Sequence, residues 1–248
     1  LQYSQRLGYN LELSTLHQQY DSVFLGLGLG ASRALGLTGE NAPGLMPAVD
    51  YIKTLRQTDD LGSLTVAKRC IVIGAGNTAI DMATQMARLG ATEVTLVYRR
   101  GVEAMSATDH EQEIAKANGV RMVTWAQPDE ILLDDQGRVA GMRFAKTVEQ
   151  AGQLTSTGET IEIAADAIFK AIGQSFDNTS LADATAAELA RDGERIHVNE
   201  MFQTSLPNVY AGGDCVKPGQ DLTVQAVQHG KLAAHAIHQA LAAQQEAA

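Results

Sequence analysis

Short apolar runs, separated by glycine-rich turns and amphipathic segments, recur along the chain. The run Cys70–Ile73 leads through Gly74 into a helical pattern over Thr78–Leu89, which ends at Gly90. A second apolar run, Glu93–Tyr98, follows directly. Strand, glycine turn, helix and strand within about thirty residues are typical of a βαβ unit with parallel strands. The pattern therefore predicts an α/β fold.

The second half of the chain changes to a pattern typical of antiparallel strands. Glu130–Leu133, Arg138–Phe144 and Thr160–Ala164 alternate apolar and polar residues and are separated by turn residues, which predicts a meander. Ala165–Gly173 is then a buried strand that ends in glycine, and a long helix begins at Thr223.

The turn after the first run has the form Gly74-x-Gly76-x-x-Ala79. Gly74 allows a tight strand-to-helix turn, Gly76 has no Cβ to keep a pyrophosphate from the backbone, and Ala79 lets the helix lie against the strand. The free N–H groups of the helix start favour phosphate. This is a dinucleotide-binding fingerprint; the alternative is a glycine-tolerant turn in another α/β protein.

The residues after the second run indicate which dinucleotide binds. An NAD site places Asp or Glu there to accept hydrogen bonds from the ribose 2′-OH, whereas this chain has Arg99 and Arg100. Guanidinium groups pair well with phosphate oxygens, so the two arginines favour the 2′-phosphate of NADP(H). The alternative is a pair of solvated arginines at a strand end.

A third chemically informative segment lies near the end of the chain. The strand Val209–Ala211 stops at two glycines and Asp214, and a helix start at Thr223 follows. A carboxylate after two glycines can approach a ligand hydroxyl, and a helix start stabilises negative charge on a ligand ring. These features suit a flavin; the alternative is an ordinary strand–loop–helix closure.

Two further features admit a functional interpretation. Gly26-x-Gly28-x-x-Ala31 has the spacing of a second fingerprint, but loop residues follow in place of a three-turn helix, so we interpret it as a strand that leaves one nucleotide-binding lobe. Lys170 lies inside an apolar run. We expect it to reach water along its aliphatic stem, the alternative being a contact with a cofactor or acceptor.

Composition excludes several classes of protein. The net charge of −10 argues against general nucleic-acid binding. There is no apolar run long enough to span a membrane and no visible signal peptide. The two cysteines, Cys70 and Cys215, form no C-x-x-C pair, which excludes a dithiol centre or a cysteine-ligated cluster within this chain. We expect both to be buried, in a cytoplasmic protein.

Several motifs together resemble the flavoproteins with two dinucleotide-binding domains, and within them the glutamate synthase small-subunit group. The resemblance is carried by Gly74–Asp81, Val97–Arg100, Ala171–Gln174, Ala211–Asp214 and Thr223–Val224. Two stretches, Arg99–Met105 and Ala167–Ser175, look closest to the NAD(P)H-oxidising subunit of bacterial dihydropyrimidine dehydrogenase.

The resemblance implies a Rossmann-like NADP lobe with an antiparallel meander, inserted in an incomplete FAD-binding lobe. The FAD lobe would comprise residues 1–45 and 174–248, and the NAD(P) lobe residues 46–173. The implied nucleotide site, with the arginines on the 2′-phosphate, is Gly74, Ala75, Gly76, Asn77, Thr78, Arg99, Arg100, Ala171, Ile172 and Gly173. The implied FAD site is Gly213, Asp214, Leu222 and Thr223.

The implied activity is hydride transfer from NADPH to FAD, after which electrons leave singly through iron–sulfur clusters to a partner catalytic subunit. The step needs no acid, base or nucleophile, so we name no catalytic side chain and no metal ligand. The chain opens without Met, and the first FAD fingerprint and the cluster region of the family are absent from it. We therefore expect this chain alone to bind FAD weakly or not at all, and not to pass electrons to a partner.

Three alternatives remain open. The chain has Met105-Ser-Ala107 where glutamate synthase small subunits usually have Met-Pro-Ala, which favours the pyrimidine branch, but a glutamate synthase small subunit remains possible. A disulfide reductase of the same fold would need cysteines that this chain lacks. A non-catalytic NADP(H)-sensing module is the alternative from another class.

Overall fold

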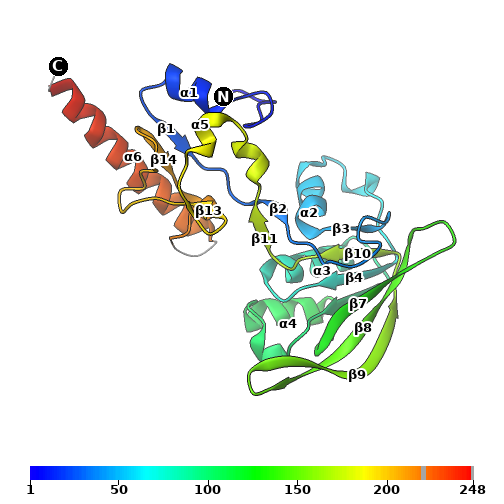
Figure 1. Cartoon of the computed structure of the whole chain (residues 1–248). Coiled ribbons are helices and arrows are strands. Elements are labelled where there is room, and N and C mark those ends of the chain that lie inside the picture. Colours follow the sequence, from blue (N-terminus) through cyan, green and yellow to red (C-terminus); the bar gives the residue numbers. More distant parts are fainter. Residues whose placement is uncertain (219–221, 247–248) are drawn as a thin grey trace. The chain divides into compact units, whose positions relative to one another are not determined.

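A computed structural model describes residues 1–218 and 222–246. The chain divides into two compact units (Figure 1). The inserted unit is Ser32–Gly173, and the discontinuous unit is Leu1–Ala31 with Gln174–Ala248.

The inserted unit is built on a five-stranded parallel sheet with the order β3-β10-β4-β5-β6. The two predicted apolar runs, Cys70–Ile73 and Glu93–Tyr98, form the middle strand β4 and its neighbour β5. Strands covered on both faces need side chains that are apolar throughout. The strands are β3 (Leu45–Pro47), β4 (Arg69–Ile73), β5 (Glu93–Val97), β6 (Arg121–Val123) and β10 (Ala167–Lys170). The predicted α/β class is confirmed.

Three helices cover one face of this sheet: α2 (Ala48–Gln57), α3 (Asn77–Arg88) and α4 (Asp109–Ala117). Val72 faces these helices in one apolar cluster, which includes Ala79 of α3 and Ala115 of α4. Its neighbour Ile71 belongs to a cluster on the opposite face, as expected from the alternation of side chains along a strand. Two 3₁₀ turns, η1 (Leu61–Ser63) and η2 (Val102–Ala104), complete the connections.

The opposite face of the parallel sheet packs against the predicted antiparallel meander (Figure 1). Its strands are β7 (Ala126–Leu133), β8 (Val139–Gln150) and β9 (Gln153–Ala164). Met142 and Phe144 point into the apolar cluster, whereas Arg143 between them pairs with Glu130 and Glu162. The inserted unit therefore has three layers: helices, parallel sheet and meander.

The discontinuous unit has a parallel pair of buried strands, β1 (Val23–Leu25) and β14 (Val209–Ala211). Two smaller pairs are β2 (Gly30–Ser32) with β11 (Gln174–Phe176), and β12 (Arg191–Asp192) with β13 (Arg195–Ile196). The helical elements are α1 (Leu13–Gln19), η3 (Asn178–Leu181), α5 (Ala184–Ala187), η4 (Gly213–Cys215) and α6 (Thr223–Glu246).

The first boundary between the units differs from the one we predicted. The structure assigns residues 32–45 to the inserted unit, whereas the sequence placed them in the first lobe. Leu35 and Leu37 pack against the apolar cluster of the meander face, and Leu45 pairs with Ile168 in the sheet. These contacts are tertiary, so a loop-like composition gave no sign of them.

The second glycine motif and helix α5 show how local sequence patterns relate to the structure. The second glycine motif ends inside strand β2, which contains its Ala31, and the next helix begins only at Ala48, so its rejection is confirmed. Helix α5 extends over only four residues, because the alanine-rich segment around it supplies helix propensity without a long apolar stripe. Among the described residues, no helix is both long and apolar enough to cross a membrane.

Candidate functional site

The glycine turn lies at the carboxyl end of β4. Gly74 has φ of 148°, a backbone conformation that residues with a Cβ rarely adopt. Its N–H donates to the Val97 carbonyl at 3.0 Å, which holds the turn to β5. A Cβ added to Gly74 would collide with the backbone oxygen of Ala171. Glycine is therefore required here by both dihedral angle and space.

The helix that follows this turn begins without side-chain capping. Gly76 is the N-cap of α3, and the first turn contains no acidic residue. In contrast, α4 begins with a full capping box formed by Thr108 and Glu111. The first N–H groups of a helix have no intrahelical acceptors, and Asn77 and Thr78 are exposed. The start of α3 thus offers its N–H groups and positive dipole end to an anion.

The segment after η2 closes one side of the turn. The Ala107 N–H donates to the Ala75 carbonyl at 3.0 Å, and a Cβ on Gly76 would lie 3.3 Å from Ser106 Oγ. The sequence drew attention to Ser106 only as a departure from a family pattern. The structure places its hydroxyl beside the helix start, where it can donate to the same anion.

Arg99 and Arg100 follow β5, the strand next to β4 in the sheet. Their backbone carbonyls accept hydrogen bonds from the meander side, from Thr147 Oγ1 at 2.7 Å and from the Trp125 N–H at 3.1 Å. Within the part of the chain that the structure describes, neither guanidinium forms an ion pair. The backbone is therefore fixed while two positive charges stay available to a ligand.

Ala171, Ile172 and Gly173 follow β10, which adjoins β4 on its other side. The Ala171 N–H donates to the Ile73 carbonyl at 2.7 Å, so this segment begins level with the glycine turn. After β4 the chain forms β5 and then β6 on one side of β4, with connecting helices on one face of the sheet. It then forms the meander on the other face and re-enters the sheet as β10, on the opposite side of β4. The carboxyl ends of β4 and β10 thus flank a topological switch point, where open α/β sheets bind ligands.

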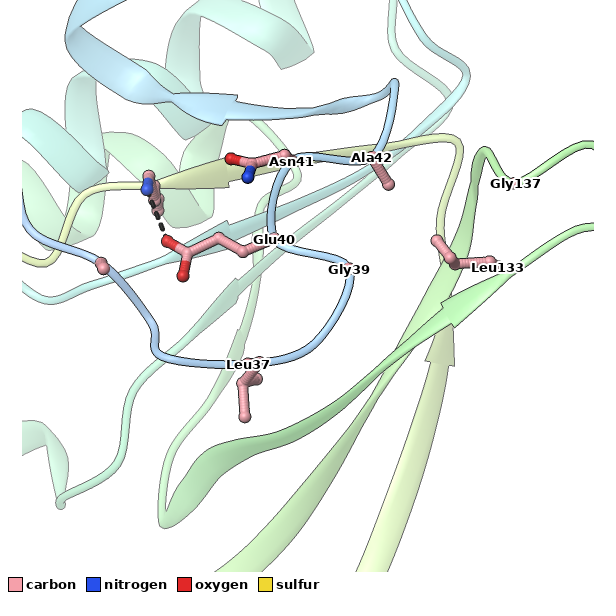
Figure 2. Close-up of a pocket in the computed structure, with 9 residues that line it drawn as sticks. Leu37, Gly39, Glu40, Asn41, Ala42, Leu133 and Gly137 are labelled. Atoms are coloured by element: carbon pink, nitrogen blue, oxygen red, sulfur yellow. Dashed lines mark hydrogen bonds and ion pairs between the residues drawn. The ribbon is translucent and has the colours of Figure 1, made fainter.

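Lys170, the last residue of β10, does not reach water as we predicted. Its Nζ lies 2.5 Å from Glu40 Oε1, and both side chains are only 12% exposed. Figure 2 shows Glu40 among the residues that line a neighbouring cavity. The two carboxylate oxygens also accept the N–H groups of Leu35 and Gly36 at 2.8 and 2.9 Å. The pair lines an open cavity of about 570 Å³. The snorkelling interpretation is wrong, because a buried carboxylate 130 positions away supplies the partner.

These contacts give Glu40 a defined acid–base behaviour. Burial raises the pKa of the Glu40 carboxyl, but the hydrogen bond and charge of Lys170, with the N–H groups of Leu35 and Gly36, outweigh burial. The pKa therefore lies below the ordinary value of 4.5.

The low pKa of Glu40 predicts a pH-dependent contribution to stability. It is complete above the unfolded-state pKa and is lost as pH falls through the folded-state pKa. Glu40→Gln removes the titrating group. The difference in free energy of unfolding between the parent and this variant should therefore become smaller as the pH falls from about 7 to about 3. Urea titrations across this range measure it. A constant difference would contradict the prediction.

The four predicted flavin residues lie in the discontinuous unit. Gly213 and Asp214 belong to η4, which follows β14, and Gly213 has a φ of 75°. At the start of α6, the carbonyl of Leu222 accepts the N–H groups of Gln225 and Ala226. Leu222 and Thr223 are exposed. The first turn of α6 contains no acidic residue, so this helix start is also compatible with a negatively charged group.

His229 ties this segment together and was missed in the sequence. Its ring is buried on α6, and its Nδ1 lies 3.2 Å from the N–H of Gly213. Since Nδ1 accepts this hydrogen bond, the ring proton is assigned to Nε2. A Cβ on Gly212 would meet the His229 Cβ at 3.0 Å, so the pair of glycines permits this close packing.

The two cysteines are buried and free, as predicted. Burial, aided by the charge of Asp166, raises the pKa of the Cys70 thiol to about 12, and burial also raises the pKa of Cys215. Both are protonated at neutral pH, so neither is a reactive thiolate.

Comparison with known proteins identifies the family of the chain. A family described as pyridine nucleotide-disulphide oxidoreductase matches residues 8–230. The chain is 32% identical over 250 residues to the glutamate synthase (NADPH) small chain of Escherichia coli (strain K12), covering 93% of this chain and 52% of that protein. It is 33% identical over 246 residues to the NADP(+)-dependent formate dehydrogenase subunit beta of Moorella thermoacetica, covering 95% and 34%. The chain thus spans about half of the first relative's length and about a third of the second's.

Solved structures support the fold. Thioredoxin reductase of T. acidophilum superposes with a TM-score of 0.68 at 23% identity, covering 88% of this chain and 65% of that one. Mycobacterium tuberculosis FprA in complex with NADPH superposes with a TM-score of 0.72 at 18% identity, covering 97% and 68%.

Proposed function

The chain belongs to the pyridine nucleotide-disulphide oxidoreductase family, and from this premise we propose that it binds NADPH and FAD in an oxidoreductase of the glutamate synthase small-subunit type. The observation that carries the proposal is the carboxyl edge of the parallel sheet. There an uncapped helix start follows a turn that only glycine can form, and two arginines without ion-pair partners among the described residues follow the next strand.

The inserted unit supplies the groups that a dinucleotide with a 2′-phosphate needs. Gly74 to Thr78 would hold the pyrophosphate by backbone N–H groups, because the missing Cβ atoms leave room for close approach. Arg99 and Arg100 would pair with the 2′-phosphate. Ala171, Ile172 and Gly173 would border the nicotinamide half. These roles are binding and orientation, and none of these side chains needs to transfer a proton.

The discontinuous unit would hold FAD through Gly213, Asp214, Leu222 and Thr223. Asp214 suits the ribityl hydroxyls, and the start of α6 suits the edge of the ring on which negative charge develops. When bound, NADPH supplies a hydride and FAD accepts it. The protein contributes orientation and electrostatics, and His229 keeps Gly213 in place. We propose that residues 1–45 and 174–248 form the FAD lobe and that residues 46–173 form the NADP lobe. In the structure, residues 32–45 pack with the NADP lobe.

The finer proposal concerns the partner. We propose a reductase subunit of the dihydropyrimidine dehydrogenase type that delivers electrons, through iron–sulfur clusters outside this chain, to a partner catalytic subunit in the cytoplasm. The similarity over Arg99–Met105 and Ala167–Ser175 supports it. A glutamate synthase small subunit is the alternative, favoured by the relative from Escherichia coli. Uracil-dependent NADPH oxidation by the intact gene product would support the first, and NADPH-dependent formation of glutamate would support the second. Absence of bound flavin would instead favour a sensing module.

The choice of dinucleotide is tested by calorimetric titration of this chain with NADP⁺ and NAD⁺. We expect NADP⁺ to bind at least about tenfold more tightly, and Arg99→Ala or Arg100→Ala each to cost roughly 1.5–3 kcal/mol, because a charge-assisted contact is lost. The matched control is Arg121→Ala, an exposed arginine at the amino end of β6, which should change nothing. Equal affinities for the two dinucleotides would contradict the role of the arginines.

A further inference from the structure

We propose that Arg33 is a third cationic residue of the nucleotide site and that it binds phosphate and ribose oxygens of the nicotinamide mononucleotide half. This inference rests on the proposed NADP(H) function and deepens it. Nothing in the sequence pattern marked Arg33, because it lies in a stretch that reads as a loop between the two lobes.

The first observation is the position of the Arg33 side chain. Its backbone N–H donates to the Gly173 carbonyl at 3.2 Å. A Cβ built on Gly173 would lie 3.7 Å from Arg33 Cδ and 3.8 Å from Nε, so the side chain runs along the backbone of residue 173. Gly173 has a φ of 100° and no side chain that would displace Arg33. Arg33 therefore lies beside the segment that follows β10, which contains the residues proposed for the nicotinamide half.

The second observation is the order and register of the strands. Lys170 of β10 is level with Ile73 of β4, and Ile73 is level with Val97 of β5. The three strand ends thus form one line at spacings of roughly 4.8 Å. A dinucleotide with its pyrophosphate at β4 and its 2′-phosphate at β5 must extend its other nucleotide toward β10. Arg33 lies on that side, and Arg99 lies on the other.

The third observation is that the backbone around Arg33 is fixed although its guanidinium is exposed. Glu40 accepts the N–H groups of Leu35 and Gly36 and is itself held by Lys170 (Figure 2). Within the described residues the Arg33 side chain forms no ion pair. A guanidinium presents five donors in a planar fork, which suits phosphate and ribose oxygens.

The test compares NADP⁺ with adenosine 2′,5′-bisphosphate, which contains the 2′-phosphate end but lacks the nicotinamide half. Both are titrated calorimetrically into the parent chain and into Arg33→Ala, Arg33→Lys, Arg99→Ala and the control Arg121→Ala. We expect Arg33→Ala to weaken NADP⁺ binding by about 10- to 100-fold and to leave the bisphosphate within about twofold. Arg99→Ala should weaken both ligands. Arg33→Lys should fall between, because it keeps the charge without the fork.

The possible outcomes separate this inference from the proposed function. If the parent binds neither ligand, the NADP(H) function itself fails and the inference with it. If the parent binds both and Arg33→Ala weakens neither, or weakens both equally, the function stands and the role of Arg33 is refuted. Unfolding midpoints of the variants, expected to match that of the parent, exclude a general loss of structure.

Discussion

Gly74→Ala is expected to destabilise the inserted unit by about 2 to 6 kcal/mol and to remove detectable NADP⁺ binding. Two costs add. The φ of 148° is nearly restricted to glycine, and a Cβ would overlap the Ala171 backbone oxygen. Ala171 cannot withdraw easily, because its N–H is bonded to the Ile73 carbonyl at 2.7 Å. Urea unfolding measures the first effect and calorimetry the second.

Gly90→Ala provides the matched control for this change. Gly90 also has a positive φ, 103°, in the same unit, but a Cβ there would meet no atom within 4 Å. It lies after the far end of α3, away from the glycine turn. We expect a loss of about 1 kcal/mol from backbone strain alone and unchanged binding. If both variants lost equal stability, the contact with Ala171 would make no contribution to the cost of Gly74→Ala. If Gly74→Ala still bound NADP⁺, the proposed site would be contradicted.

The parts of the fold that the sequence predicted are those with local causes. The β4–α3–β5 unit follows from apolar runs, a glycine turn and an amphipathic helix that are contiguous in the chain. The capping box at Thr108 and Glu111 is equally local, because the two residues that form it are three positions apart in the chain. The meander follows from alternation and turn residues. Each signal specifies a backbone conformation without reference to distant residues.

The parts that the sequence did not predict depend on contacts between distant segments. Lys170 in an apolar run looks the same whether its charge reaches water or a buried carboxylate, and only the fold brings Glu40 to it. Arg33 becomes a candidate ligand only when its loop lies against Gly173. Ser106 and His229 acquire their positions beside Gly76 and Gly213 in the same way. The fingerprint locates the centre of the site, and tertiary packing determines its borders.

The Glu40–Lys170 ion pair gives the second large effect. Glu40→Gln is expected to destabilise the inserted unit by about 2 to 4 kcal/mol, because it leaves the Lys170 charge buried without a counter-charge. Lys170→Met should cost less, since Glu40 keeps its bonds to Leu35 and Gly36. The range lies below that of a fully enclosed pair because both groups line an open cavity.

A double-mutant cycle measured by urea unfolding tests whether the two charges act as a pair. Glu40→Gln combined with Lys170→Met removes both charges and keeps an acceptor oxygen for the loop, so the double variant should be more stable than the sum of the single changes implies. The exposed pair Lys146–Glu159 is the control, because Glu159→Gln should change stability little in water. Additive effects at Glu40 and Lys170 would contradict a coupled pair. Coupling, in contrast, would mean that one buried contact anchors both the loop that carries Arg33 and the end of β10.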